Sequence, residues 1–242
     1  MFDVGYSDVF IKNAQILNVD LTSIDKIILS HGHNDHTWGL NHLSQYYDRI
    51  IKKTERKIDI ISHPAALMPK YFEAKPIGMN HRQDEIEYFF RKVCTIEPLK
   101  LSNNITFLGQ IPRINKFEAQ NPVGHTHDAD GKLIDDYVLD DSALVIKTKK
   151  GLIIITGCSH AGICNIIEYA KKVTGVSQVN SVIGGFHLLN ADKKLLDGTG
   201  QYLKSISAET LYPCHCTDLA AKIHLSSYVD IKEVGVGLSL NF

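Results

Sequence analysis

The richest group of metal-binding side chains lies in one short segment, Ser30-His31-Gly32-His33-Asn34-Asp35-His36. In an extended turn, the alternate residues His31 and His33 point the same way, whereas Asp35 and His36 reach toward a second position nearby. Three imidazoles and a carboxylate cannot crowd one tetrahedral zinc and leave a position for water, but they can begin two adjacent sites. The spacing therefore predicts a site for a pair of divalent cations.

A cation pair of this kind is suited to hydrolysis. Two divalent cations that share a water lower the pKa of that water toward neutrality, so a metal-bound hydroxide becomes available to attack a carbonyl carbon or phosphorus. Asp35, besides binding metal, could orient the water or accept its proton. Zinc is the default for a nitrogen-rich set of ligands, although iron or manganese fits the same side chains.

Four apolar segments each lead into a turn that carries a histidine, and each segment is predicted to be a buried strand. The segments span residues 24–29, 152–156, 179–183 and 210–212, and the turns that follow them carry His31, His160, His187 and His215. Open α/β folds build their sites at the carboxyl ends of strands. We therefore predict the α/β class, with these histidines along one edge of a sheet.

The remaining elements are read from apolar spacing and turn residues. Helices are predicted at 7–18, 40–47 and 163–173, a strand at 58–62, and a strand at 144–148 that forms a hairpin with 152–156. Residues 121–141 are polar and acidic, so they are predicted to be a loop. We interpret residues 64–110 as an insertion that contains a helix at about 84–94.

Size and charge narrow the classes of function. With 242 residues, the chain is long enough for one large α/β domain, and its net charge of -1 gives no reason to expect nucleic acid or an anionic membrane as a partner. No apolar run approaches the length of a membrane span. Five cysteines, an odd number, do not resemble a disulfide framework. We expect a cytoplasmic protein with a small-molecule substrate, and its oligomeric state stays open.

Residues 30–40, Ser-His-Gly-His-Asn-Asp-His-Thr-Trp-Gly-Leu, resemble the signature of the metallo-β-lactamase superfamily. Four further segments resemble the branch named after the 7,8-dihydropterin-6-methyl-4-(β-D-ribofuranosyl)-aminobenzene-5'-phosphate synthases: Phe2–Gly5, Thr156–Gly162, Gly184–Leu188 and Pro213–Thr217. The resemblance implies one domain over residues 1–242 with an αββα sandwich. Relatives normally have a strand hairpin before the segment that starts at Phe2, so we expect either a truncated sequence or a reduced first sheet.

The resemblance also implies a set of metal ligands. His31 and His33 would bind the first metal, and Asp35 and His36 would bind the second. His160 would be the third ligand of the first metal, and His215 would complete the second site. His187 would join Asp35 as a catalytic residue, as a hydrogen-bond donor or proton shuttle. A histidine satisfied within the core is the alternative for His187, although the preceding Gly-Gly pair would let the backbone pass close to a ligand.

Two positions depart from the superfamily pattern and leave alternatives open. Cys158 stands where relatives have a bridging aspartate, so it is either a ligand or, more commonly for such a residue, a buried structural cysteine. Asp141 stands where many relatives have a histidine ligand, and we favour a solvated loop carboxylate over a ligand there.

The other histidines are not expected to bind metal. His125-Thr126-His127-Asp128 imitates the main motif, but no strand is predicted before it, and a mobile loop that contacts substrate is the alternative. We expect structural roles for His42, His63, His81 and His224.

Three functions are compatible with these residues. The first is a binuclear metal-dependent hydrolase, or a related synthase, that acts on a small-molecule ester, lactone or phosphoester, with a pterin-related substrate suggested by the resemblance. The second is a metal-dependent nuclease or phosphodiesterase, which would want a basic groove that the charge does not indicate. The third is a non-catalytic protein that binds metal or a ligand.

Overall fold

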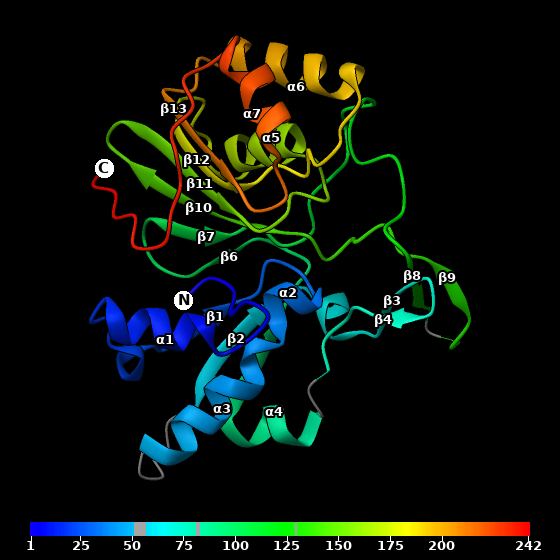
Figure 1. Cartoon of the computed structure of the whole chain (residues 1–242), viewed down its shortest axis with the longest axis vertical. Helices are drawn as coiled ribbons and strands as arrows, with labels where there is room; N and C mark the ends of the chain where they lie inside the picture. The colour runs from blue at the N-terminus through cyan, green and yellow to red at the C-terminus, as the bar shows by residue number, and fades with distance from the viewer. Residues whose placement is uncertain (51–56, 81–82, 129) are drawn as a thin grey trace. The chain divides into compact units, whose positions relative to one another are not determined.

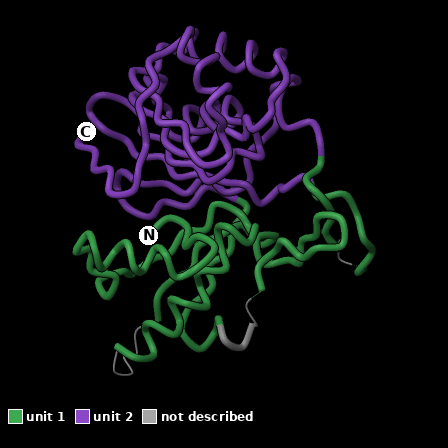
Figure 2. Tube along the Cα trace, in the orientation of Figure 1, with its two compact units in different colours: residues 1–96, 122–136 green, residues 97–121, 137–242 purple. Residues whose placement is uncertain are grey.

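The computed structural model describes residues 1–50, 57–80, 83–128 and 130–242. The chain forms two compact units, each built from two segments (Figure 2). Unit 1 comprises residues 1–96 and 122–136, and unit 2 comprises residues 97–121 and 137–242. That the chain is one domain with an insertion at about 64–110 stays a prediction.

Unit 1 is centred on a parallel sheet of three strands in the order β1-β2-β5. These strands are β1 (Lys26–Ile28), β2 (Ile58–Ser62) and β5 (Phe90–Cys94). The helices of the unit are α1 (Val9–Ile16), α2 (Asn34–Thr37), α3 (Gly39–Ile50) and α4 (Gln83–Phe89), with 3-10 turns at Leu21–Ser23 and Pro64–Leu67. Leu40 and Leu43 of α3 belong to the same buried cluster as Ile27 and Ile60 of the sheet. This apolar packing between α3 and the sheet holds β1 in place, and His31 and His33 follow shortly after β1.

A second sheet in unit 1 has four short strands in the order β4-β3-β8-β9, all antiparallel. They are β3 (Lys70–Phe72), β4 (Lys75–Pro76), β8 (His125–His127) and β9 (Leu133–Asp135). Lys70 and Asp136 form an ion pair of 2.8 Å there, and their side chains are only 2% and 5% exposed. The pair ties the two chain segments of unit 1 together.

Removing one partner of this ion pair should destabilise the protein strongly. The Asp136→Ala substitution removes the carboxylate that pairs with the buried Lys70 ammonium, and such a loss typically costs about 3–5 kcal/mol of unfolding free energy. Replacing both groups, as in Lys70→Met with Asp136→Leu, should recover most of that loss because no buried charge remains. Urea denaturation measures both, and a single variant as stable as the wild type would contradict the prediction.

Unit 2 contains a sheet of six strands in the order β13-β12-β11-β10-β7-β6. The strands are β6 (Leu99–Lys100), β7 (Ile105–Phe107), β10 (Ala143–Thr148), β11 (Gly151–Thr156), β12 (Val179–Gly185) and β13 (Thr210–Cys214). Three helices, α5 (Ile163–Thr174), α6 (Lys193–Ser205) and α7 (Leu219–Ser226), lie on one side of it (Figure 1). Buried residues of all three helices share one apolar cluster with the sheet, including Ile154, Val182, Ile166, Leu203 and Leu225.

We predicted that the four strands that lead into histidine-bearing turns end at one edge of a sheet. This prediction is correct for three of the strands. β11, β12 and β13 are parallel neighbours, so their carboxyl ends meet at one edge. β1, which precedes His31, lies in the other unit and in a different sheet. The prediction was wrong there because apolar composition identifies a buried strand but does not indicate which strand pairs with it.

Two predicted elements also need correction. The helix expected at about 84–94 ends at Phe89, and residues 90–94 form β5 because their backbone pairs in parallel with β2. The loop expected at 121–141 contains β8 and β9, which pair with each other, and β8 also pairs with β3. Within the described residues, no helix is long and apolar enough to cross a membrane.

Candidate metal centre

The first histidines of the motif are held in a tightly constrained turn after β1. A Cβ atom added to Gly32 would lie 2.3 Å from the carbonyl oxygen of Ala66, so only glycine fits between the two histidines. His33 is the last extended residue before α2. Its carbonyl accepts a hydrogen bond of 2.9 Å from Thr37 Oγ1. Backbone crowding and this bond fix the directions of the side chains before any ligand arrives.

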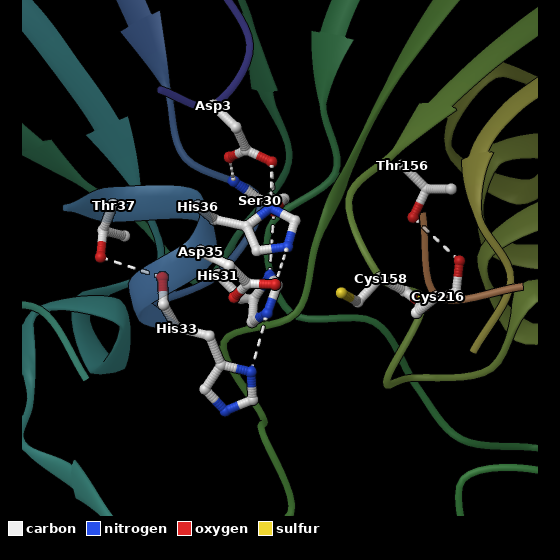
Figure 3. A network of polar contacts seen from close by, with 11 residues as sticks. Asp3, Ser30, His31, His33, Asp35, His36, Thr37, Thr156, Cys158 and Cys216 are labelled. Carbon is white, nitrogen blue, oxygen red and sulfur yellow. Dashed lines mark hydrogen bonds and ion pairs between the residues drawn. The ribbon is translucent and has the colours of Figure 1, made fainter. Parts of the chain in front are cut away.

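Donor atoms of His31, His33 and Asp35 converge, and the predicted division of the motif between two cations stays a prediction. His31 Nε2 lies 3.0 Å from His33 Nδ1 (Figure 3). One donor atom from each of His31, His33 and Asp35 lies within 4.8 Å of the others. Two imidazole nitrogens and a carboxylate at such spacing suit a divalent transition-metal ion such as zinc. The residues present therefore fit a metal ion.

Asp3 is a candidate site residue that the sequence analysis did not single out. Its Oδ2 accepts hydrogen bonds of 2.7 Å from His36 Nδ1 and 2.8 Å from Ser30 Oγ, and its Oδ1 accepts one of 2.7 Å from Ser30 N (Figure 3). Because Ser30 Oγ donates to Asp3, it accepts from His31 Nδ1 at 2.9 Å. Both His31 and His36 therefore carry a proton on Nδ1, which leaves Nε2 as the ring atom that could bind a metal ion.

The charge around His36 favours a cation. Burial lowers the pKa of His36, but the carboxylates of Asp3 and Asp35 outweigh burial and raise that pKa to about 10. The same two negative charges would attract a divalent ion. The signal that could have identified Asp3 is a carboxylate just before Gly5, in a segment that pairs with β1 through the Phe2–Ile28 bridge.

Asp3→Asn should weaken metal binding while leaving the fold intact. The amide is similar in size to the carboxylate, but it has lost the charge that orients His36 and raises its basicity. Losing such a partner typically lowers metal affinity by about 10- to 100-fold. Competition with a fluorescent chelator measures the affinity. Asp8→Asn is the matched control, since Asp8 is a carboxylate of the same unit paired with Lys12 instead, and an equal loss in both variants would contradict this role of Asp3.

In unit 2, a predicted site residue follows each of the three parallel strands. These residues are His160, His187 and His215, and in the three turns Ser159, His187 and His215 have left-handed φ angles of 62°, 52° and 54°. This conformation is costly for residues other than glycine and occurs where the surroundings enforce it. The rings of His160 and His187 lie 4.3 Å apart between centroids. The structure thus brings His160 and His187 together at this sheet edge.

The Gly184-Gly185 pair allows close packing between strand ends. Gly184 has φ +133°, and a Cβ there would lie 2.1 Å from the carbonyl oxygen of Thr156. A Cβ on Gly185 would lie 2.6 Å from Cys216 Sγ. That the pair also lets the backbone pass close to a ligand stays a prediction.

Cys158 and Cys216 lie beside these histidines. Cys158 is buried, and its carbonyl oxygen accepts a contact of 3.3 Å from Cys216 Sγ. A hydrogen bond with the Cys158 side chain, together with His187, lowers the pKa of the Cys216 thiol to about 4. The sequence analysis missed Cys216 as part of this cluster, although its position next to His215 was a signal.

Asp141 is not a solvated loop carboxylate. It is buried, and its Oδ2 accepts a hydrogen bond of 2.9 Å from the backbone N–H of Ala161. Burial raises the pKa of Asp141 to about 7. The expectation was wrong because the polar sequence before β10 packs under the turn that carries His160.

Among the described residues, the histidines outside the predicted site belong to none of the groups of converging metal-binding atoms. His125 and His127 sit within β8, not on a loop, where His127 packs against Tyr71 and His125 Nε2 lies 3.5 Å from Asp135. His63 has a structural role, since its Nδ1 accepts the N–H of Ala65 at the start of a 3-10 turn. His42 lies on α3 and His224 lies 2.9 Å from Asp197, whereas His81 lies outside the described residues.

The fold and this site define the class of the protein. A family model of the metallo-β-lactamase superfamily matches residues 1–90. A curated relative is 34% identical over 92% of this chain and 76% of its own length. The chain belongs to the metallo-β-lactamase superfamily, and the predicted fold class is confirmed.

The individual relatives indicate which proteins of the superfamily this chain resembles. The curated relative is the 7,8-dihydropterin-6-methyl-4-(β-D-ribofuranosyl)-aminobenzene-5'-phosphate synthase of Methanocaldococcus jannaschii. The crystal structure of Tm1679, described as a metal-dependent hydrolase of the β-lactamase superfamily, is 31% identical with a TM-score of 0.85, covering 100% of this chain and 88% of that one. Zn(2+)-bound PqqB from Methylobacterium extorquens shares the fold at 10% identity and a TM-score of 0.51, covering 99% and 82% of the two chains. These similarities support an enzyme that depends on metal and has an unassigned substrate.

Proposed function

We propose that the protein is a hydrolase that uses two divalent cations to cleave an ester, lactone or phosphoester bond in a small molecule. The observation that carries this proposal is the convergence of one donor atom each from His31, His33 and Asp35 within 4.8 Å, with Asp3 orienting His36 beside them. A metal-binding cluster that is already oriented costs little to organise at the moment of reaction. The similarity to a named metal-dependent hydrolase over the whole chain supports the same class.

We assign six side chains to the two cations. His31, His33 and His160 would hold the first cation, and Asp35, His36 and His215 would hold the second. The proposal rests on the residue types, which suit zinc, and on the match to the superfamily motif. The zinc-bound relative with the same fold makes zinc the first metal to test.

Different side chains would take different parts in the hydrolysis. Bound cations would lower the pKa of a water molecule and polarise the scissile bond. Asp35 would hold that water in line or take its proton. His187 would donate a proton to the leaving group, since it is exposed at the end of β12 and its ring packs against His160.

The similarity to a pterin-related synthase makes a phosphorylated, pterin-like molecule one substrate to include. The protein should be purified, its metal content determined by elemental analysis, and its turnover measured with phosphodiester, lactone and pterin phosphate substrates. We expect bound metal and hydrolysis of at least one phosphoester. A folded protein that takes up no zinc, iron or manganese would refute the proposal, and a fully loaded protein with no turnover on the whole panel would favour a non-catalytic metal-binding protein.

A further inference from the structure

The hydroxyl of Ser159 links the turn that carries His160 to the turn that carries His187. Ser159 lies directly before His160, and its Oγ donates a hydrogen bond of 2.6 Å to the carbonyl oxygen of Gly185, two residues before His187. Because the single proton of the hydroxyl is used there, Ser159 Oγ accepts the bond of 3.0 Å that joins it to Thr156 Oγ1 (Figure 3). Two hydrogen bonds therefore fix the Ser159 side chain between the ends of β11 and β12.

The backbone of Ser159 is in a conformation that favours glycine. Its φ angle is 62°, in the left-handed region that is costly for residues with a Cβ atom. A turn that needed only this backbone conformation would be formed without strain by glycine. Residue 159 is instead a serine that is 1% exposed and whose hydroxyl makes two hydrogen bonds. Strain at a side chain with such specific contacts indicates that the hydroxyl has a role that glycine could not fill.

The bond from Ser159 completes a double link between the two turns. The N–H of Gly185 donates to the carbonyl oxygen of Gly157 at 2.9 Å, and the carbonyl oxygen of Gly185 accepts from Ser159. Two residues further along, the ring of His187 lies 4.3 Å from the ring of His160 between centroids, with an angle of 55° between the ring planes. The hydroxyl of Ser159 therefore acts at the point where the spacing of the two rings is set.

We propose that Ser159 is a positioning residue that holds the ring of His187 against the ring of His160. The inference rests on the proposed hydrolase function, in which His160 would hold a cation and His187 would donate a proton to the leaving group. A proton donor must lie within hydrogen-bond reach of the atom that it protonates, and a displacement of about 1 Å can cost about 100-fold in rate. Because Ser159 is buried and acts through His187, its loss should lower kcat and leave KM nearly unchanged.

Ser159→Gly removes the hydroxyl and keeps the backbone, because glycine adopts a φ angle of 62° without strain. In the zinc-loaded protein, this variant should lower kcat by about 10-fold and change KM by less than about 2-fold. Its melting temperature should stay close to that of the wild type, since relief of strain offsets the lost hydrogen bonds. Ser207→Gly is the matched control, because Ser207 is an exposed serine of the same unit with a φ angle of 50°. We expect wild-type kcat and KM from the control, and equal kcat values for the two variants would overturn the inference.

A nuclear Overhauser measurement separates failure of the positioning role from failure of the hydrolase proposal. Ring protons of His160 and His187 should give a cross-peak in the wild type, because the ring centroids lie 4.3 Å apart, and Ser159→Gly should lose it. Thr156→Val removes only the hydrogen bond donated to Ser159 and should weaken the same cross-peak, which keeps the test open if the glycine variant fails to fold. Loss of the cross-peak in a protein whose wild type shows no turnover would refute the hydrolase function and leave the positioning role supported. A cross-peak of wild-type intensity in the folded variants, or its absence from the wild type, would overturn the inference.

Discussion

Replacing His33 with alanine should lower turnover by more than about 100-fold and reduce the metal content by about one equivalent. Losing a partner that only orients a ligand already costs about 10- to 100-fold, so losing the ligand itself should cost more. His33 Nδ1 lies 3.0 Å from His31 Nε2, so its removal takes away half of the nitrogen pair at the centre of the cluster. Elemental analysis and kcat/KM on the best substrate measure both effects.

His127→Ala is the control for this substitution. His127 is a half-buried histidine of the same unit, but it lies in β8 and packs against Tyr71. We expect wild-type metal content and activity from the control. If His33→Ala retained two equivalents of metal, the assignment of the motif as the metal centre would fail.

Chelation should have the second large effect, on both activity and stability. The metal-free protein should be inactive, and zinc should restore turnover. A ligand that binds only the folded state stabilises it by about 4 kcal/mol at a thousandfold excess over its Kd. Removing the metal should therefore lower the melting temperature by several degrees, as thermal unfolding with and without chelator would show.

The control for chelation is the His33→Ala variant, which already lacks one of the proposed metal ligands. In His33→Ala, the chelator should shift the melting temperature much less, since less metal is bound. A wild-type protein whose activity and melting temperature both survive exhaustive chelation would contradict a role for metal in this fold.

The motif at residues 30–36 could be predicted because its donors are adjacent in sequence. Donors within seven consecutive residues stay near one another, and in the structure one donor atom each of His31, His33 and Asp35 lies within 4.8 Å of the others. Asp3 was missed because its role depends on a strand bridge to Ile28, 25 residues further along the chain. Long-range pairing of this kind leaves no periodic signal.

The fold shows the same division between local and long-range information. β2 and α5 were predicted to within one residue, because a run of isoleucines and an amphipathic repeat fix them locally. The strand at 125–127 has no apolar pattern and forms through its partners, β3 and β9. Asp141 was predicted to be solvated for a related reason, since its burial comes from packing against the turn at Ala161.

Anomalous diffraction at the absorption edge of the bound metal tests the central claim most directly. The account predicts two peaks per chain, one bound by His31, His33 and His160 and the other by Asp35, His36 and His215. A single peak held by other residues, or an absence of peaks from crystals grown with excess zinc, would contradict the account.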